Sequence, residues 1–284
     1  MFNSRLGFKT EEDLGSGYKA GAWLEAALNP DNGTINATGK FWHRRSTVSL
    51  YGPFGEVRVG RDLDATFWNL TLFDPFGTVG VGSGFNLQSN LGSGAATLIR
   101  ADNAISYYLP RLGGFDGQLE VAPGEGVPGN GYRAARFGYQ QGALNVAVAY
   151  GVTKTATLDD FKVANGGVSY DFGFATAMLM ANVSRYGEKK LINLEVGFYA
   201  PVGQVGQVRA SYQRANASGA GTDANDARQI AVGYIHYLSK RTALYTTYSS
   251  ISNDGAAAFA VSTPPVAVAG KSSKGYEFGI KHSF

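Results

Sequence analysis

Residues 143–151 read ALNVAVAYG, and this stretch shows the pattern that decides the fold. Small or polar residues alternate with larger apolar ones, which stand at Leu144, Val146, Val148 and Tyr150. Successive side chains of a β-strand point to opposite faces, so this alternation predicts a strand with one apolar face. The same period appears at 56–61, 103–109 and 276–284, and together these segments predict an all-β fold.

Short turns and longer polar loops separate the strands in a regular order. Turns such as 15–17 and 113–114 alternate with longer segments rich in Asn, Gly, Asp, Ser and Pro. The longer segments are 29–39, 62–100, 123–131, 152–162, 184–189, 215–227 and 251–273. This asymmetry is typical of transmembrane antiparallel β-barrels, which have short periplasmic turns and long extracellular loops. We therefore expect one barrel domain over 1–284, with about fifteen strands visible.

The composition is consistent with this architecture and excludes several others. The chain has 39 glycines, as many tight turns require, and no cysteine, which excludes disulfide scaffolds and cysteine-based sites. No apolar stretch reaches the roughly 18 residues that a membrane helix needs. A mean hydropathy of -0.13 fits strands with one apolar and one polar face. The net charge of +3, without a basic run, gives no indication of nucleic-acid binding.

Three segments and the last residue carry a resemblance to a known family. The segments are 4–15 (SRLGFKTEEDLG), 52–61 (GPFGEVRVGR) and 102–108 (DNAISYY), and the last residue is Phe284. The chain resembles the general Gram-negative porins, which are trimeric, sixteen-stranded diffusion channels of the outer membrane. The resemblance implies a homotrimer in outer-membrane lipid that passes ions and small hydrophilic solutes without a cofactor. It also implies an assembly signal formed by Tyr276, Phe278, Ile280 and Phe284.

The N-terminus departs from the pattern of this family. Bacterial single-chain barrels have an even number of strands, because an odd number cannot close with every neighbour antiparallel. In the family, the motif that begins at Ser4 follows a first strand and a signal peptide. We therefore expect that the first strand is missing and that Met1 is an internal or misassigned start.

The candidate site is the pore. The longest loop, 62–100, contains Asp62, Asp64 and Asp74, and the resemblance implies that this loop folds into the barrel and narrows it. Strand parity places a set of bases on the lumen side, namely Arg5, Lys9, Lys19, Arg45, Arg58, Arg100 and Arg136. Because rings of charge select ions, this excess of bases predicts a weak preference for anions.

Two other classes of protein share parts of this pattern. An outer-membrane barrel enzyme of the protease or lipase type needs a nucleophile or an activated water beside a base. His43, His236 and His282 lie far apart in the sequence, with no acid or serine placed to form a relay, so we predict no catalytic residue and no metal site. A soluble β-sandwich would also show alternation, but it does not explain the asymmetry of the turns and loops.

Overall fold

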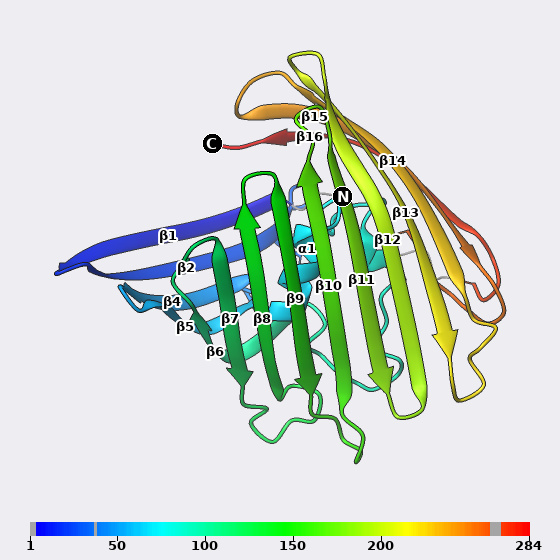
Figure 1. Cartoon of the computed structure of the whole chain (residues 1–284), viewed down its shortest axis with the longest axis horizontal. Coiled ribbons are helices and arrows are strands. Elements are labelled where there is room, and N and C mark those ends of the chain that lie inside the picture. The colour runs from blue at the N-terminus through cyan, green and yellow to red at the C-terminus, as the bar shows by residue number, and fades with distance from the viewer. Residues whose placement is uncertain (1–3, 37–38, 262–267) are drawn as a thin grey trace.

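The computed structural model describes residues 4–36, 39–261 and 268–284, which form one strongly curved antiparallel sheet (Figure 1). Its strands are β1 (Ser4–Gly15), β2 (Tyr18–Asn29), β3 (Thr34–Ile35), β4 (Arg45–Gly52), β5 (Gly55–Leu63), β6 (Arg100–Tyr108), β7 (Phe115–Ala122), β8 (Tyr132–Gln141), β9 (Leu144–Thr153), β10 (Phe161–Asp171), β11 (Thr176–Tyr186), β12 (Lys189–Val202), β13 (Gly206–Ser218), β14 (Ala227–Tyr237), β15 (Thr242–Asn253) and β16 (Ser273–His282). The prediction of an all-β antiparallel fold is confirmed. The strand β3 is a two-residue addition within the first long loop.

Strands that are neighbours in the sheet are also neighbours in the sequence. The order runs from β1 and β2 through β4 to β16 without a crossover, and β3 pairs with β2. Each pairing is antiparallel, as in the hairpins of β1 with β2 and of β15 with β16. Within the described residues, β1 and β16 are therefore the two edges of the sheet, and both run from the long-loop end toward the short-turn end.

One predicted boundary was wrong. The segment 184–189 was expected to be a long loop, but β11 and β12 meet in a tight hairpin. Gly187 makes this possible, since its φ of 55° lies in the left-handed region that a two-residue turn requires.

The burial pattern is the reverse of that in a soluble protein. Apolar residues on the outward face are exposed, such as Val48 at 63% and Phe278 at 70%, while polar residues on the inward face are buried, such as Ser249 at 0% and Asn193 at 2%. Such an exterior fits a surrounding apolar medium. In the part of the chain that the structure describes, no helix is long and apolar enough to cross a membrane.

The segment between β5 and β6 contains helical structure that the sequence did not predict. The helix α1 (Ala65–Leu72) is followed by a short 3-10 helix, η1 (Gly84–Leu87). Asp64 caps the start of α1, because its carboxylate accepts a hydrogen bond from the backbone N–H of Phe67. Figure 1 shows α1 behind the front wall of the sheet, and it contacts β7, β8, β9 and β10.

Glycines of the wall allow this segment to come close to the strands. A Cβ atom at Gly167 of β10 would overlap the ring of Phe73, and one at Gly197 of β12 would lie 2.5 Å from Cγ of Pro75. Any larger residue would therefore force the segment away from the wall.

Candidate pore lining

The inward face of β1, β2 and β4 carries two bases around one aromatic ring. Lys9 pairs in register with Trp23, so both side chains lie on the same face. The guanidinium carbon of Arg45 lies 4.0 Å from the centre of the Trp23 ring, and Nζ of Lys9 lies 5.3 Å from it. Cations are attracted to the face of an aromatic ring, so Trp23 holds these two bases close together. Alternation along the strands predicted that both bases lie on the lumen face, but it gave no reason to select Trp23 as a pore residue.

Arg58 is held by acids and by a tyrosine. Its guanidinium donates to Asp62 at 2.7 Å, to Glu56 at 2.8 Å and to the hydroxyl of Tyr108 at 2.8 Å. Nε of Arg45 lies 3.5 Å from the carboxylate of Asp62, which therefore lies between the two arginines. Of the three loop acids that the sequence selected, Asp62 is the one that meets the predicted bases, and it stands on β5 itself.

The prediction that Arg100 shares the lumen face of Arg58 was wrong. Asn103 adopts a φ of 54°, and the register between β5 and β6 shifts beside Gly60. Because of this bulge, the side chains before Asn103 point to the opposite face from the one that strict alternation, counted back from Tyr108, predicts. Arg100 consequently pairs with Leu63, and its Nε donates to the backbone oxygen of Arg44 at 2.7 Å.

The remaining predicted bases lie at three separate places. Arg5 lies 3.9 Å from Glu25, which also pairs with Arg44 at 2.6 Å. Lys19 forms an ion pair of 2.8 Å with Glu11 near the first short turn. Arg136 is buried, forms an ion pair with Asp116, and donates from Nε to Asn69 of α1 at 3.0 Å. The predicted bases are thus not one continuous ladder.

The other two predicted acids organise the loop. Asp64 is fully buried, and burial raises its pKa to about 6. Asp74 is also buried, which raises its pKa, and its carboxylate accepts hydrogen bonds from the backbone N–H groups of Phe76 at 2.7 Å and Gly84 at 2.8 Å. Both carboxylates therefore fix the backbone of their own loop.

Amides of the inward face attach the loop to the wall. Asn165 of β10 accepts from Asn69 at 2.9 Å and donates to the backbone oxygen of Thr66 at 2.9 Å. Similar bonds run from Asn193 of β12 to Leu87, and from Gln213 of β13 to Gly84. These contacts lie on β10 to β13, whereas Lys9, Arg45 and Arg58 stand on the opposite part of the sheet, β1 to β5.

A cavity of about 910 Å³ adjoins the bend of the loop and the two edges of the sheet. Its lining includes Arg5, Asp74, Arg209 and Lys281. The guanidinium of Arg209 lies 5.6 Å from the centre of the Phe76 ring. Arg209 was missed in the sequence, although it has the same strand parity as the polar residues Ser211 and Gln213. Among the described residues, no three His, Cys, Asp or Glu side chains converge as a metal site.

A family model described as Gram-negative porin matches residues 1–256. This chain belongs to that family. It is similar to outer membrane porin protein 32 of Delftia acidovorans, at 37% identity over 99% of this chain and 84% of the relative. An outer membrane porin of Bordetella pertussis is 27% identical over 88% of this chain and 77% of the relative.

Solved structures give the same assignment. The anion-selective porin from Comamonas acidovorans matches with a TM-score of 0.91 and 36% identity, over 99% of this chain and 90% of that structure. The trimer form of OmpT from Vibrio cholerae matches with a TM-score of 0.72 at 14% identity, over 98% of this chain and 89% of that one, which supports the fold. The chain is therefore a porin, a channel of the Gram-negative outer membrane, and its relatives are channels and not enzymes.

The last strand of this porin presents its aromatic residues to the exterior. Tyr276, Phe278 and Ile280 are 72%, 70% and 65% exposed on the outward face of β16, and Phe284 follows the strand. Their role as a signal for outer-membrane assembly stays a prediction.

Proposed function

We propose that this porin prefers anions weakly among the small hydrophilic solutes that it passes. The observation that carries the proposal is a difference in accessibility between the inward acids and bases. Five acids are at most 8% exposed, namely Asp62, Asp64, Asp74, Glu120 and Glu195. By contrast, the side chain of Arg5 is 42% exposed, and Lys9 is exposed as well.

Ion pairing leaves the accessible charge positive. Other inward acids were not included when the sequence was used to compare bases with acids on the lumen side. These acids are paired with bases, as Glu11 is with Lys19 and Glu56 is with Arg58. Within the described residues, Lys9 has no acid within 4.0 Å. The similarity to a porin that is itself anion-selective supports the same preference in this chain.

We also propose that the loop 62–100 forms the constriction of this pore. Its attachment to β10 through β13 supports this role, because it leaves Lys9, Arg45 and Arg58 opposite the loop. A solute that passes between loop and wall would then meet the exposed Lys9 and the partly buried Arg45 and Arg58 on one side. Charges that line a narrow pore in this way select ions by sign.

Reversal potentials in a planar bilayer under a salt gradient test the anion preference. Replacing both Lys9 and Arg45 by Gln should lower the ratio of anion to cation permeability, by about twofold for each charge at roughly 8 Å from the ion in 0.1 M salt, where the Debye length is about 10 Å. The control Lys240→Gln/Arg241→Gln, at the turn before β15, should leave the ratio unchanged. The preference should shrink in 1 M salt, where the Debye length is about 3 Å. A cation preference of the unmodified chain would overturn the proposal.

The assembly that we propose is a homotrimer, with the outward faces of β1 to β5 as the interface. The outward residues of β2 include Ala20 and Ala22, which are partly exposed and allow close approach of a neighbouring wall. Val48 and Leu50 of β4 add exposed apolar surface beside them. The trimer form of the OmpT relative supports this assembly.

A further inference from the structure

Asp74, at the bend of the loop 62–100, lies against Glu195 on the inward face of β12. A Cβ atom at Gly84 would overlap Oε2 of Glu195 and lie 3.2 Å from Oδ2 of Asp74, so the two carboxyl oxygens stand around the same point. Asp74 is 4% exposed and Glu195 is 2% exposed. Two carboxyl groups therefore share one buried site between the loop and the wall.

No base neutralises this pair in the part of the chain that the structure describes. No Lys, Arg or His nitrogen of these residues lies within 4.0 Å of either carboxyl group. The residues directly opposite Glu195 on the neighbouring strands are Met180 and Gln213, which carry no charge. Two acids thus lie together without a counter-charge in contact.

The base that faces Asp74 from β13 is Arg209, and it is engaged elsewhere. Its guanidinium donates to the side-chain oxygen of Gln207 at 3.3 Å and lies 5.6 Å from the centre of the Phe76 ring. The other ionisable groups near Arg209 are Tyr237 and Glu277. Its charge is therefore divided among several groups and does not form an ion pair with Asp74.

Hydrogen-bond donors reach Asp74 but not Glu195. Three backbone N–H groups donate to the carboxylate of Asp74, namely those of Phe76 at 2.7 Å and of Thr78 and Gly84 at 2.8 Å. Among the described residues, neither oxygen of Glu195 has a hydrogen-bond partner, and the hydroxyl of Ser211 beside it has none either. A buried carboxylate without donors is costly, so the ionised form of Glu195 is not stabilised by its surroundings.

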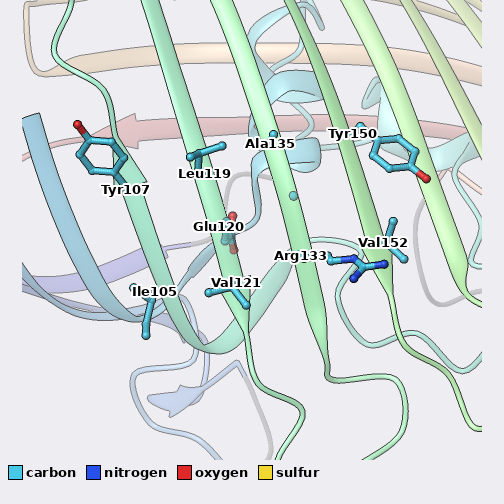
Figure 2. A pocket seen from close by; sticks show the side chains of 10 residues that line it. Ile105, Tyr107, Leu119, Glu120, Val121, Arg133, Ala135, Tyr150 and Val152 are labelled. Carbon is cyan, nitrogen blue, oxygen red and sulfur yellow. The ribbon is translucent and has the colours of Figure 1, made fainter.

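A second pair of loop and wall acids shows the contrast. In Figure 2, Leu119 and Val121 of β7 line an apolar depression on the outward face, while Glu120 between them lies on the opposite side of the strand and is buried. Glu120 accepts a hydrogen bond from the backbone N–H of Ala65 at 2.9 Å. Because Asp64 has donors as well, both members of this pair are served, unlike the pair at the bend.

Amides of the wall hold the same part of the loop. Gln213 donates to the backbone oxygen of Gly84 at 2.9 Å, and Gln229 of β14 donates to that of Ser83 at 3.0 Å. These hydrogen bonds are neutral and do not change with pH. The carboxyl pair is therefore the contact in this region that titrates.

We propose that Asp74 and Glu195 share one proton, and that loss of this proton releases the bend of the loop from β12 toward the opposite wall and narrows the pore. With the proton in place, the two groups form one charge-assisted O–H···O hydrogen bond. Without it, two negative charges repel each other in a buried site. Burial raises the pKa of Asp74, so the proton is bound at low pH and is lost as the pH rises.

The charges of the two walls set the direction of the movement. The N–H groups that bind Asp74 belong to its own loop, so the bend moves together with this carboxylate. Lys9, Arg45 and Arg58 stand on the opposite part of the sheet and attract a negative charge. The proposal rests on the proposed role of the loop as the constriction, and it adds that pH sets the width of the opening.

Pulsed electron paramagnetic resonance can measure the movement itself. The chain has no cysteine, so Val79→Cys on the loop and Val196→Cys on the outward face of β12 can carry two nitroxide labels. We expect the distance between the labels to increase from pH 5 to pH 9 by about 5 Å, the spacing of one strand. Glu195→Gln should keep the short distance at both pH values, because its amide donates to Asp74 without a titrating proton. The control Glu188→Gln, at an exposed position in the turn before β12, should behave as the native chain does.

Single-channel conductance in 1 M KCl gives a second readout. It should fall by about twofold from pH 5 to pH 9 in the native chain, as the loop crosses part of the opening, and stay constant in Glu195→Gln. Asp74→Asn removes the charge from the other member of the pair and keeps an oxygen for the N–H groups of the loop. It should give the same two results, including where Glu195→Gln does not fold.

A label distance that does not change with pH in the native chain would overturn the proposal. A change that persists in both Glu195→Gln and Asp74→Asn would overturn it as well, because another group would then be responsible. An increased distance with an unchanged conductance would support the release of the loop and refute its role as the constriction.

Discussion

Asp64 caps the start of α1, but its carboxylate is fully buried, and a negative charge is unfavourable there. Its Oδ1 accepts hydrogen bonds from the backbone N–H of Phe67 and the hydroxyl of Thr66, while its Oδ2 has no hydrogen-bond partner among the described residues. Burial raises its pKa from 3.8 to about 6. The folded protein therefore holds a proton that the unfolded chain releases between these two pH values.

The free energy of unfolding should consequently fall as the pH rises from about 4 to about 6. The shift in the pKa of Asp64 corresponds to about 3 kcal/mol. Asp64→Asn keeps an oxygen for the helix cap and carries no charge, so it should raise the midpoint of thermal unfolding at pH 7 but not at pH 4. Circular dichroism melts of the two proteins in detergent measure this difference.

The exposed Asp254→Asn serves as a control and should show no such pH dependence. If Asp64→Asn shifts the midpoint equally at both pH values, the buried carboxyl is not the cause.

Strand parity located individual pore residues where the strands are regular. It placed Lys9, Arg45 and Arg58 on one face, because β4 pairs without a register shift and the shifts in β1 and β5 lie beyond Lys9 and Arg58. It failed for Arg100, because the left-handed Asn103 reverses the parity of that strand. Nothing in the local sequence marks Asn103 as a bulge, since asparagine is also common in regular turns.

At the scale of elements, the wall glycines determine how closely the loop can pack. Gly167→Val should displace Phe73, increase single-channel conductance and destabilise the protein by about 1–3 kcal/mol, as overpacking does. The matched control is Gly166→Val, on the same strand but with its Cβ on the outward face beside Val148. Planar-bilayer recordings in 1 M KCl measure the conductance. Equal conductance of the two variants would show that Phe73 does not limit the opening.

The length of 62–100 predicted a functional loop, but α1 was not predictable from its residues. Its segment ATFWNLTL contains two threonines and two aromatic residues, which have weak helix propensity, and it has no charged face. The helix is stabilised by contacts that are distant in the sequence, such as the bond between Asn69 and Asn165. A hydrophobic period taken from eight residues could not reveal those contacts.

At the scale of the whole molecule, the trimer proposal predicts that two similar valines differ in importance. Val48 on β4 is 63% exposed and Val148 on β9 is 56% exposed, and both face outward. An arginine at either site costs about 2–4 kcal/mol on the lipid face near the midplane. Val48→Arg should in addition convert trimers to monomers, whereas Val148→Arg should not.

Light scattering in detergent, compared with the chain mass of 30.1 kDa, gives the assembly state of each variant. Trimers that persist in Val48→Arg and dissociate in Val148→Arg would place the interface on the other side of the sheet.

The sequence predicted the barrel architecture more completely than it predicted the packing of the loop inside the barrel. The alternation of apolar residues such as Val146 and Val148 with small or polar ones indicates which face of a strand contacts lipid. This inference requires no knowledge of the partner strands. The fit between loop and wall depends on pairs such as Phe73 with Gly167, which alternation does not encode.

The bonds between loop and wall also have a consequence for the order of folding. They join Asn69 to Asn165 across 96 positions, Leu87 to Asn193 across 106, and Gly84 to Gln213 across 129. Contacts between such distant residues form slowly, because chain entropy is lost before any bond is gained. The loop can therefore dock only when the strands through β13 are in register, and the channel reaches its final width as a late event in its own maturation.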